Sequence, residues 1–321
     1  MAYQRIDGDP DPETVRGLTF VPFLPDGRCM VAPGPALPTG EVRPGEYYLL
    51  DTSARIPMDT VGFRFQRVHP FAADGDHVYL WLDGDRYRAD GHPDAVVATA
   101  EELADRLDPA TAEVVRDAAH SFRTQTDASY YADNVRVLEP AYLRGTTPQA
   151  GSGFGGDAAG WRARRGMILD GVHRPGTFLD MGCANGLLME SVRKWAGERD
   201  LVLEPYGVDL APGLVDLARR RLPEWADRIE VGNAIDYTPA DGRRFTFVHV
   251  LLDAVPRHRR TDLIRHLLTL VEPGGRLLVS HYQSRGGSDR SAAEHLRDLG
   301  FPVAGTTAAE GATTAWLDQT A

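Results

Sequence analysis

Cysteine, lysine and long apolar runs are nearly absent from this sequence. Of its 321 residues only Cys29 and Cys183 are cysteines, and Lys194 is the single lysine. Two cysteines far apart in the sequence, behind a polar start without a basic and apolar leader, indicate a protein of the reducing cytoplasm. No apolar run approaches the roughly 20 residues needed to span a bilayer.

The net charge of −11 is unfavourable for binding to strongly anionic partners. Binding to phosphate backbones or to anionic membranes requires clustered Lys and Arg, and this composition supplies no general attraction to either. We therefore expect neither nucleic acid nor a membrane as a partner. The length, with 42% hydrophobic residues, is sufficient for two globular domains that each have a core.

The most informative stretch is residues 178–188, Phe-Leu-Asp-Met-Gly-Cys-Ala-Asn-Gly-Leu-Leu. An apolar run ends in an acid, passes through two glycines and opens into an apolar-faced segment, which predicts a strand, a tight turn and a helix. Gly182 can adopt dihedrals closed to other residues, and the missing Cβ of Gly186 would let a ligand lie against the backbone. Because the following helix directs free N–H groups into the same space, a nucleoside-sized ligand is expected there.

Residues 1–107 are expected to form a small mixed α and β domain. Alternating apolar runs bounded by turn residues predict strands near 18–24, 29–32, 62–68 and 77–82, and residues 100–107 predict a short helix.

Segments 40–46 and 55–63 of this domain resemble the signature of the Nudix hydrolases. The opening glycine, Glu46 and the closing Gly-Phe pair match, but Pro57 lies in the middle of the expected helix. The metal-binding glutamates of the family are replaced by Ile56, Asp59 and Thr60. Magnesium on a diphosphate needs several converging carboxylates, so the resemblance implies a Nudix-like accessory domain without hydrolase activity. The alternative is an unrelated β-rich domain.

Residues 108–160 are expected to form a helical connector. An Asp-Pro pair at 108–109 begins a helix well, and a second helix is predicted over 130–143. Five of the thirteen residues 145–157 are glycine, which is consistent either with a flexible linker or with a mobile lid over a ligand.

Residues 161–321 alternate apolar strands with helical patterns, as in a parallel sheet covered on both faces. The predicted fold class is therefore α/β: a doubly wound, mostly parallel, seven-stranded Rossmann-like sheet, preceded by the smaller mixed domain and the helical connector.

Five ordered pieces of this region resemble the class I S-adenosylmethionine-dependent methyltransferases. They are Asp180 to Gly186, Tyr206 to Asp209, Gly232 to Ala234, Leu252-Asp253, and Leu270 to Leu277 with its Pro-Gly-Gly turn. The resemblance implies a Rossmann-like methyltransferase domain with S-adenosylmethionine as the cofactor. A dinucleotide fingerprint would need a middle glycine that Cys183-Ala184-Asn185 does not supply.

The resemblance also implies cofactor-binding residues. Asp209 would accept hydrogen bonds from the ribose hydroxyls, Asp180 would hold the ammonium or an ordered water, and Asn233 would face the adenine amino group, although the family more often has Asp there. Gly182 and Gly186 would let the methionine part pass close to the backbone. The complete expected set is Asp180, Gly182, Cys183, Gly186, Asp209, Leu210, Asn233 and Ala234.

Methyl transfer from a sulfonium is an in-line displacement, for which the protein mainly supplies alignment and a dry pocket. If a general base is used, His281 is the first candidate, because an imidazole titrates near neutral pH, and Asp253 is the second. No metal is expected. The fourth strand lacks the Asn-Pro-Pro or Asp-Pro-Pro sequence of amino-methylating enzymes that act on nucleic acid, so the expected acceptor is a small molecule.

Two alternatives stay open, as does the oligomeric state. The chain could bind S-adenosylmethionine without catalysis, or it could be bifunctional, with the first domain hydrolysing a nucleoside diphosphate derivative.

Overall fold

The computed structural model describes residues 3–6, 8, 10–86, 92, 94–282 and 290–320. It divides into two compact units, and the division falls after Val137, inside helix α4 (Asp127–Leu143). Helix α3 and the first part of α4 therefore belong to the first unit. The expected boundaries after residues 107 and 160 stay predictions.

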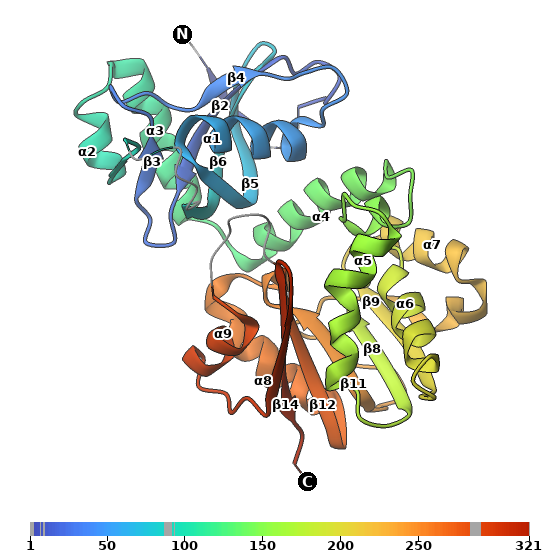
Figure 1. Cartoon of the computed structure of the whole chain (residues 1–321). Coiled ribbons are helices and arrows are strands. Elements are labelled where there is room, and N and C mark those ends of the chain that lie inside the picture. Colours follow the sequence, from blue (N-terminus) through green and yellow to red (C-terminus); the bar gives the residue numbers. More distant parts are fainter. Residues whose placement is uncertain are drawn as a thin grey trace. The chain divides into compact units, whose positions relative to one another are not determined.

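The first unit is built on a mixed sheet with the strand order β1-β5-β6-β2-β3-β7 and with β4 paired to β2 (Figure 1). Its strands are β1 (Gln4–Arg5), β2 (Gly17–Phe23), β3 (Cys29–Val31), β4 (Thr39–Glu41), β5 (Phe63–Asp74), β6 (His77–Arg86) and β7 (Val96–Ala98). The β2–β6 pair is parallel and the other pairs are antiparallel. This agrees with the mixed α and β domain expected here, whereas its Nudix-like character stays a prediction.

Short helical elements complete the first unit: η1 (Tyr48–Thr52), α1 (Ser53–Val61), α2 (Ala100–Ala104) and α3 (Pro109–Arg123). The Asp108 side chain accepts hydrogen bonds from two backbone N–H groups at the start of α3, and Pro109 occupies the first helical position. An Asp cap followed by Pro is a favourable helix start. Pro57 lies within α1, as the sequence predicted.

The second unit contains a seven-stranded sheet with the order β10-β9-β8-β11-β12-β14-β13. Its strands are β8 (Gly176–Met181), β9 (Leu203–Asp209), β10 (Ile229–Val231), β11 (Phe245–Leu251), β12 (Val271–Tyr282), β13 (Gly305–Ala309) and β14 (Ala312–Asp318). Strands β8 to β12 are parallel, and β14 is antiparallel to both of its neighbours. The sheet is therefore mostly parallel, as expected, and the antiparallel strand β14 makes it a mixed sheet.

Helices cover both faces of this sheet (Figure 1). They are α5 (Ala158–Arg165), α6 (Leu187–Gly197), α7 (Pro212–Arg221), α8 (Arg260–Leu270) and α9 (Ala292–Asp298), with shorter turns η2 (Ala150–Ser152), η3 (Gly166–Gly171), η4 (Pro223–Arg228), η5 (Leu252–Ala254) and η6 (Arg257–Arg259). Apolar residues of α5, η3 and α6 pack on Phe178, Phe247 and Leu278, which share one face of the sheet.

Strand β12 continues through Tyr282, so His281 lies inside this strand. Among the described residues no helix is long and apolar enough to cross a membrane.

Candidate active site

The turn after β8 has the backbone geometry that its glycines predict. The φ angles of Gly182, Ala184 and Gly186 are +89°, +46° and +77°. The N–H groups of Gly182 and Cys183 donate to the carbonyl oxygen of Val208, at 2.7 and 3.1 Å, and fasten the turn to β9. A Cβ on Gly182 would meet no atom within 4 Å, so the space beside this backbone is open to a ligand.

Gly186 and Cys183 also contribute to the packing. A Cβ on Gly186 would lie 2.6 Å from Cδ1 of Leu222, so glycine allows close packing there, and its expected contact with a ligand stays a prediction. The Cys183 side chain is buried in a cluster that includes Met189, and burial raises the pKa of its thiol well above the ordinary value. Only the backbone of these two positions is left to face a ligand.

Asp209 lies at the end of β9 and forms hydrogen bonds with two loops. Its Oδ2 accepts a hydrogen bond from the N–H of Ala184 at 2.7 Å, and its Oδ1 accepts one from Ala211 at 2.9 Å. Burial raises the pKa of this carboxyl, and the nearby charges of Asp180 and Glu139 raise it further. Each carboxylate oxygen can accept a second hydrogen bond, so the group retains capacity for two hydroxyl donors.

Asp180 begins a buried polar chain that crosses four strands. Its Oδ1 is 2.8 Å from Nδ1 of His249 on β11, and Nε2 of His249 is 3.0 Å from the hydroxyl of Ser280 on β12. The Ser280 hydroxyl lies 2.7 Å from that of Thr314 on β14. All four residues are at most 2% exposed. His249 was not among the expected site residues, although a single histidine in the apolar run of β11 was a signal.

Asn233 and Ala234 follow β10, and Leu210 follows β9. The side-chain oxygen of Asn233 accepts a hydrogen bond from the N–H of Ile235 at 3.3 Å, and its amide donors are directed to no described residue. Ala234 is buried, whereas Asn233 and Leu210 are half-buried.

The two candidate bases lie in different surroundings. Asp253 is exposed in η5, directly after β11, and its charge and that of Asp209 raise the pKa of Tyr142, for which burial is the larger cause, to about 12. His281 alternates with Ser280 along β12 and so projects to the opposite face, where its ring centroid lies 5.1 Å from that of His295 on α9. Asp253 and Asp209 thus both lie close enough to Tyr142 to act on its pKa, whereas His281 projects toward His295 on the opposite face.

The glycine-rich segment is packed against the turn. Nδ2 of Asn185 donates to the carbonyl oxygen of Pro148 at 2.8 Å, and Oδ1 of Asn185 accepts from the Ser152 hydroxyl at 2.5 Å. A Cβ on Gly151 would lie 2.6 Å from Asn185, and one on Gly153 would lie 2.2 Å from the Tyr142 hydroxyl. Close contacts therefore favour glycine at both positions. The glycine-rich composition alone could not distinguish such a packed segment from a flexible linker.

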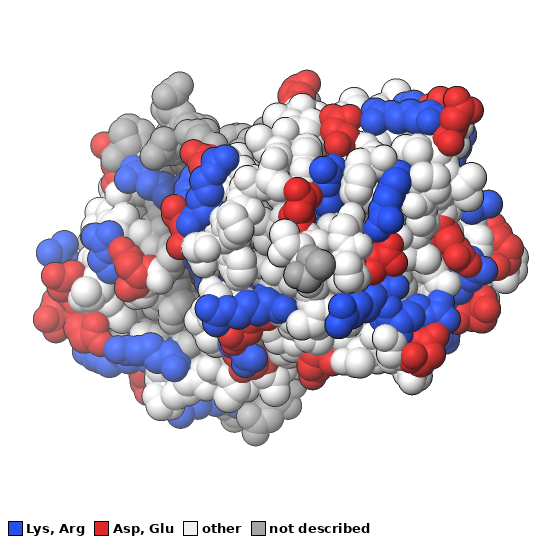
Figure 2. All heavy atoms as spheres, turned by 90° about the horizontal axis from the view of Figure 1, so that it is seen from below, with Lys and Arg blue, Asp and Glu red and all other residues white. Residues whose placement is uncertain are grey.

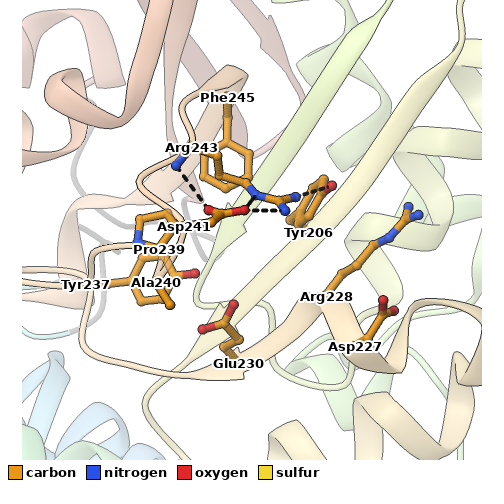
Figure 3. A pocket seen from close by; sticks show the side chains of 10 residues that line it. All are labelled: Tyr206, Asp227, Arg228, Glu230, Tyr237, Pro239, Ala240, Asp241, Arg243 and Phe245. Atoms are coloured by element: carbon orange, nitrogen blue, oxygen red, sulfur yellow. Dashed lines mark hydrogen bonds and ion pairs between the residues drawn. The ribbon is translucent and has the colours of Figure 1, made fainter.

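A separate cavity of about 360 Å³ lies near the start of β11 and is enclosed partly by Tyr206, Asp241, Arg243 and Phe245 (Figure 3). The guanidinium of Arg243 pairs with Asp241 at 2.5 Å and donates to the Tyr206 hydroxyl. Because Phe245 starts the strand whose other end carries Asp253, this cavity is remote from the glycine turn.

Basic and acidic side chains are interspersed on the face drawn in Figure 2. The second unit carries exposed ion pairs such as Arg162–Glu198 and Arg199–Asp170.

In the first unit Glu46 is fully engaged by protein partners. Arg55 donates to both of its carboxylate oxygens at 2.7 Å, and Thr52 donates to one of them. The bond from Arg55 is the main reason that the pKa of Glu46 falls to about 2. Among the described residues no group of three or more His, Cys, Asp or Glu side chains is placed to hold a metal ion.

Comparison with known families matches residues 178–275 to a model described as a methyltransferase domain. This segment is a methyltransferase domain. The enzyme class expected from the sequence, an S-adenosylmethionine-dependent methyltransferase, is confirmed, and S-adenosylmethionine is the cofactor. The open space at Gly182 and the acids ending β8 and β9 fit that cofactor.

Solved structures are similar to the methyltransferase domain at low identity. The N-methyltransferase NodS of Bradyrhizobium japonicum WM9 with S-adenosylhomocysteine has 14% identity and a TM-score of 0.44, over 58% of this chain and 98% of that chain. The 1,6-didemethyltoxoflavin-N1-methyltransferase of Burkholderia thailandensis has 17% identity and a TM-score of 0.44, over 61% and 92%. Similarity at this level carries nothing about the acceptor. No curated protein matches the chain.

Proposed function

We propose that the methyltransferase domain binds S-adenosylmethionine over the glycine turn and transfers its methyl group to a small-molecule acceptor. The observation that supports this most strongly is the open space beside Gly182, in the turn after β8, together with Asp180 near the end of β8 and Asp209 at the end of β9. In this proposal the domain comprises residues 161–321, behind a connector at 108–160 and a Nudix-like accessory domain at 1–107.

The residue roles follow from the donors and acceptors at each position. Asp209 accepts from the ribose hydroxyls with the lone pairs that Ala184 and Ala211 leave free. Asp180 attracts the ammonium group, and the turn backbone from Gly182 through Gly186 passes beside the methionine part. Asn233 faces the adenine amino group, while Leu210 and Ala234 pack on the ring.

Bound S-adenosylmethionine supplies an activated methyl group on a sulfonium, so the protein has to align the acceptor and exclude water. Asp253 is a better candidate than His281 for accepting an acceptor proton, because it is exposed near Tyr142 and Asp209. His281 remains a candidate only if its ring turns away from His295.

A small acceptor is supported by the charge of the chain. The net charge of −11 and the mixed arginines and acids of Figure 2 offer no basic surface on the face drawn that would hold a nucleic acid.

The test is a screen of small metabolites with purified protein, scored by formation of S-adenosylhomocysteine. An Asp209→Asn variant retains the shape of the side chain and should lose turnover and cofactor affinity, whereas Asp216→Asn, an exposed acid on α7, should lose neither. Cofactor binding without turnover on any acceptor would support the non-catalytic alternative. Metal-dependent phosphate release that is abolished by Glu46→Gln would instead support the bifunctional one.

A further inference from the structure

Basic side chains from three elements gather at the carboxyl ends of β11 and β12. Helices α8 and α9 both pack on β12 (Figure 1). His281, near the end of β12, and His295, on α9, have ring centroids 5.1 Å apart. Nε of Arg260, the first residue of α8, donates to the carbonyl oxygen of Leu252 at 3.2 Å, which holds the guanidinium beside the end of β11. All three basic residues are half-buried.

The basic groups act on one another electrostatically. The pKa of His295 falls to about 4, and burial of the ring is the largest cause. The nearby His281, Arg260 and Arg290 lower this pKa further, whereas Asp298 has a smaller, opposite effect and pairs with Arg290. His295 is therefore neutral near pH 7, and its ring still carries one N–H donor. An anion among these groups would offset their mutual repulsion.

The acids on the same elements do not offset this repulsion. Of residues 252–260, four are basic and Asp253, which is exposed, is the one acid. Cations in the first turn of a helix oppose its dipole, so the basic run at the start of α8 does not stabilise that helix. The other acids of α8 and α9 contact different residues: Asp262 pairs with Arg259 at 2.9 Å, Asp298 with Arg290, and Glu294 accepts hydrogen bonds from Ser291.

These basic groups lie at the same edge of the sheet as the proposed cofactor site. Strand β11 lies between β8 and β12, and its Val250 aligns with Met181 on β8 and with Val279 on β12. Neighbouring strands are about 4.8 Å apart, so the end of β12 lies about 10 Å across the sheet from the end of β8. A small molecule spans such a distance, with one end at the cofactor and the other at β12.

We propose that the methyl acceptor carries an anionic group, a carboxylate or a phosphate, and that Arg260, His281 and His295 bind this group. The inference rests on the proposed function and deepens it by naming the chemical class of the acceptor. Arg260 supplies a permanent charge and a planar fork of donors, which matches the geometry of both anions. The two imidazoles add N–H donors.

The first experiment compares matched acceptors with the full chain. Each carboxylic acid and each phosphate monoester in the screen is paired with its fully esterified, neutral form, and turnover is scored by S-adenosylhomocysteine. The wild-type protein should prefer the anionic member by about 10- to 100-fold in kcat/KM, as expected for charged hydrogen bonds. The series that is turned over distinguishes a carboxylate acceptor from a phosphate acceptor.

Variants separate anion binding from a structural role. Arg260→Gln removes the charge but retains an amide donor for Leu252, and it should raise KM for the anionic acceptor about 10-fold with little change in kcat. The neutral form should stay within about twofold, whereas a purely structural role would impair both forms equally. Arg265→Gln, at an exposed position of the same helix, is the matched control and should change neither.

A second measurement does not require the acceptor to be known. Benzoate and phenyl phosphate serve as probes, and NMR follows the imidazole C–H signals of His281 and His295, which are assigned with a glutamine variant of each. Binding of a probe should shift both signals and raise the pKa of His295, because a nearby anion favours the protonated ring. Arg260→Gln should abolish these changes, and Arg265→Gln should retain them.

Equal turnover of anionic and neutral forms, or equal impairment of both by Arg260→Gln, would overturn the inference and leave the proposed function intact. If no pair is turned over, the probes decide: shifts that depend on Arg260 support the inference, and their absence with both probes overturns it. Calorimetry with S-adenosylhomocysteine tests the proposed function separately. If that ligand does not bind, the proposed function fails, and this inference fails with it even where the probes bind.

Discussion

Variants of His249 test how Asp180 is held in position beside the proposed cofactor site. Its two ring nitrogens contact different partners, Asp180 through Nδ1 and Ser280 through Nε2. Asparagine can place an amide donor near the Nδ1 position, and glutamine can place one near the Nε2 position. His249→Asn therefore retains the bond to Asp180, His249→Gln retains the bond to Ser280, and His249→Leu retains neither.

The energetic cost follows from the two bonds. A hydrogen bond to a charged group contributes about 1.5 to 3 kcal/mol and a neutral one about 0.5 to 1.5 kcal/mol. Because His249 and Asp180 are each 2% exposed, water does not replace the lost partner. His249→Leu should therefore lower the free energy of unfolding by about 2 to 4 kcal/mol, and His249→Asn by less, because it loses only the neutral bond.

Urea unfolding of the second unit, followed in the full chain, measures these costs, and calorimetry with S-adenosylhomocysteine measures whether Asp180 is still in place. Affinity should be retained in His249→Asn and reduced in His249→Gln. Equal affinities in these two variants would refute the role given to the buried polar chain that starts at Asp180. A His249→Leu variant whose free energy of unfolding is within about 0.5 kcal/mol of wild type would refute it as well.

Three further outcomes are expected. Asn185→Ala removes two hydrogen bonds to segment 148–152 and should speed amide exchange there about 10- to 30-fold by mass spectrometry, whereas unchanged exchange would show that packing alone holds the segment. Glu46→Gln should lower the unfolding free energy by about 1 to 2 kcal/mol at pH 7, discounted for a partly exposed pair with Arg55. Because the native pKa of Glu46 is lowered to about 2, its stabilisation is complete above about pH 4.5 and is lost as the pH falls toward 2, so a difference that stays constant down to pH 2.5 would contradict the pairing. Asp133→Ala leaves two arginines without their buried carboxylate and should cost about 3 to 5 kcal/mol in the same assay, and a cost below about 1 kcal/mol would refute that.

The sequence predicted the glycine turn and the acids at the strand ends because these depend on local patterns. A strand that ends in Asp180 or Asp209 can be read from a few neighbouring residues. The mostly parallel, seven-stranded sheet followed from the alternation of apolar runs and helical patterns, and the mixed character of the sheet arises only at β14.

Residues that act through tertiary contacts were missed. Arg165 stands in a run of charged residues, where an arginine normally faces solvent, and only the packing of Trp161 and Tyr282 shows that it is buried. Gly186 was assigned to the ligand, and its close approach to Leu222, the residue after α7, could not be predicted from local sequence.

A crystal structure with S-adenosylhomocysteine would test the central claim most directly. The account predicts the ribose hydroxyls within hydrogen-bond distance of Asp209 and the ammonium beside Asp180. Ligand density in the cavity beside Tyr206, or a ribose directed away from Asp209, would contradict it.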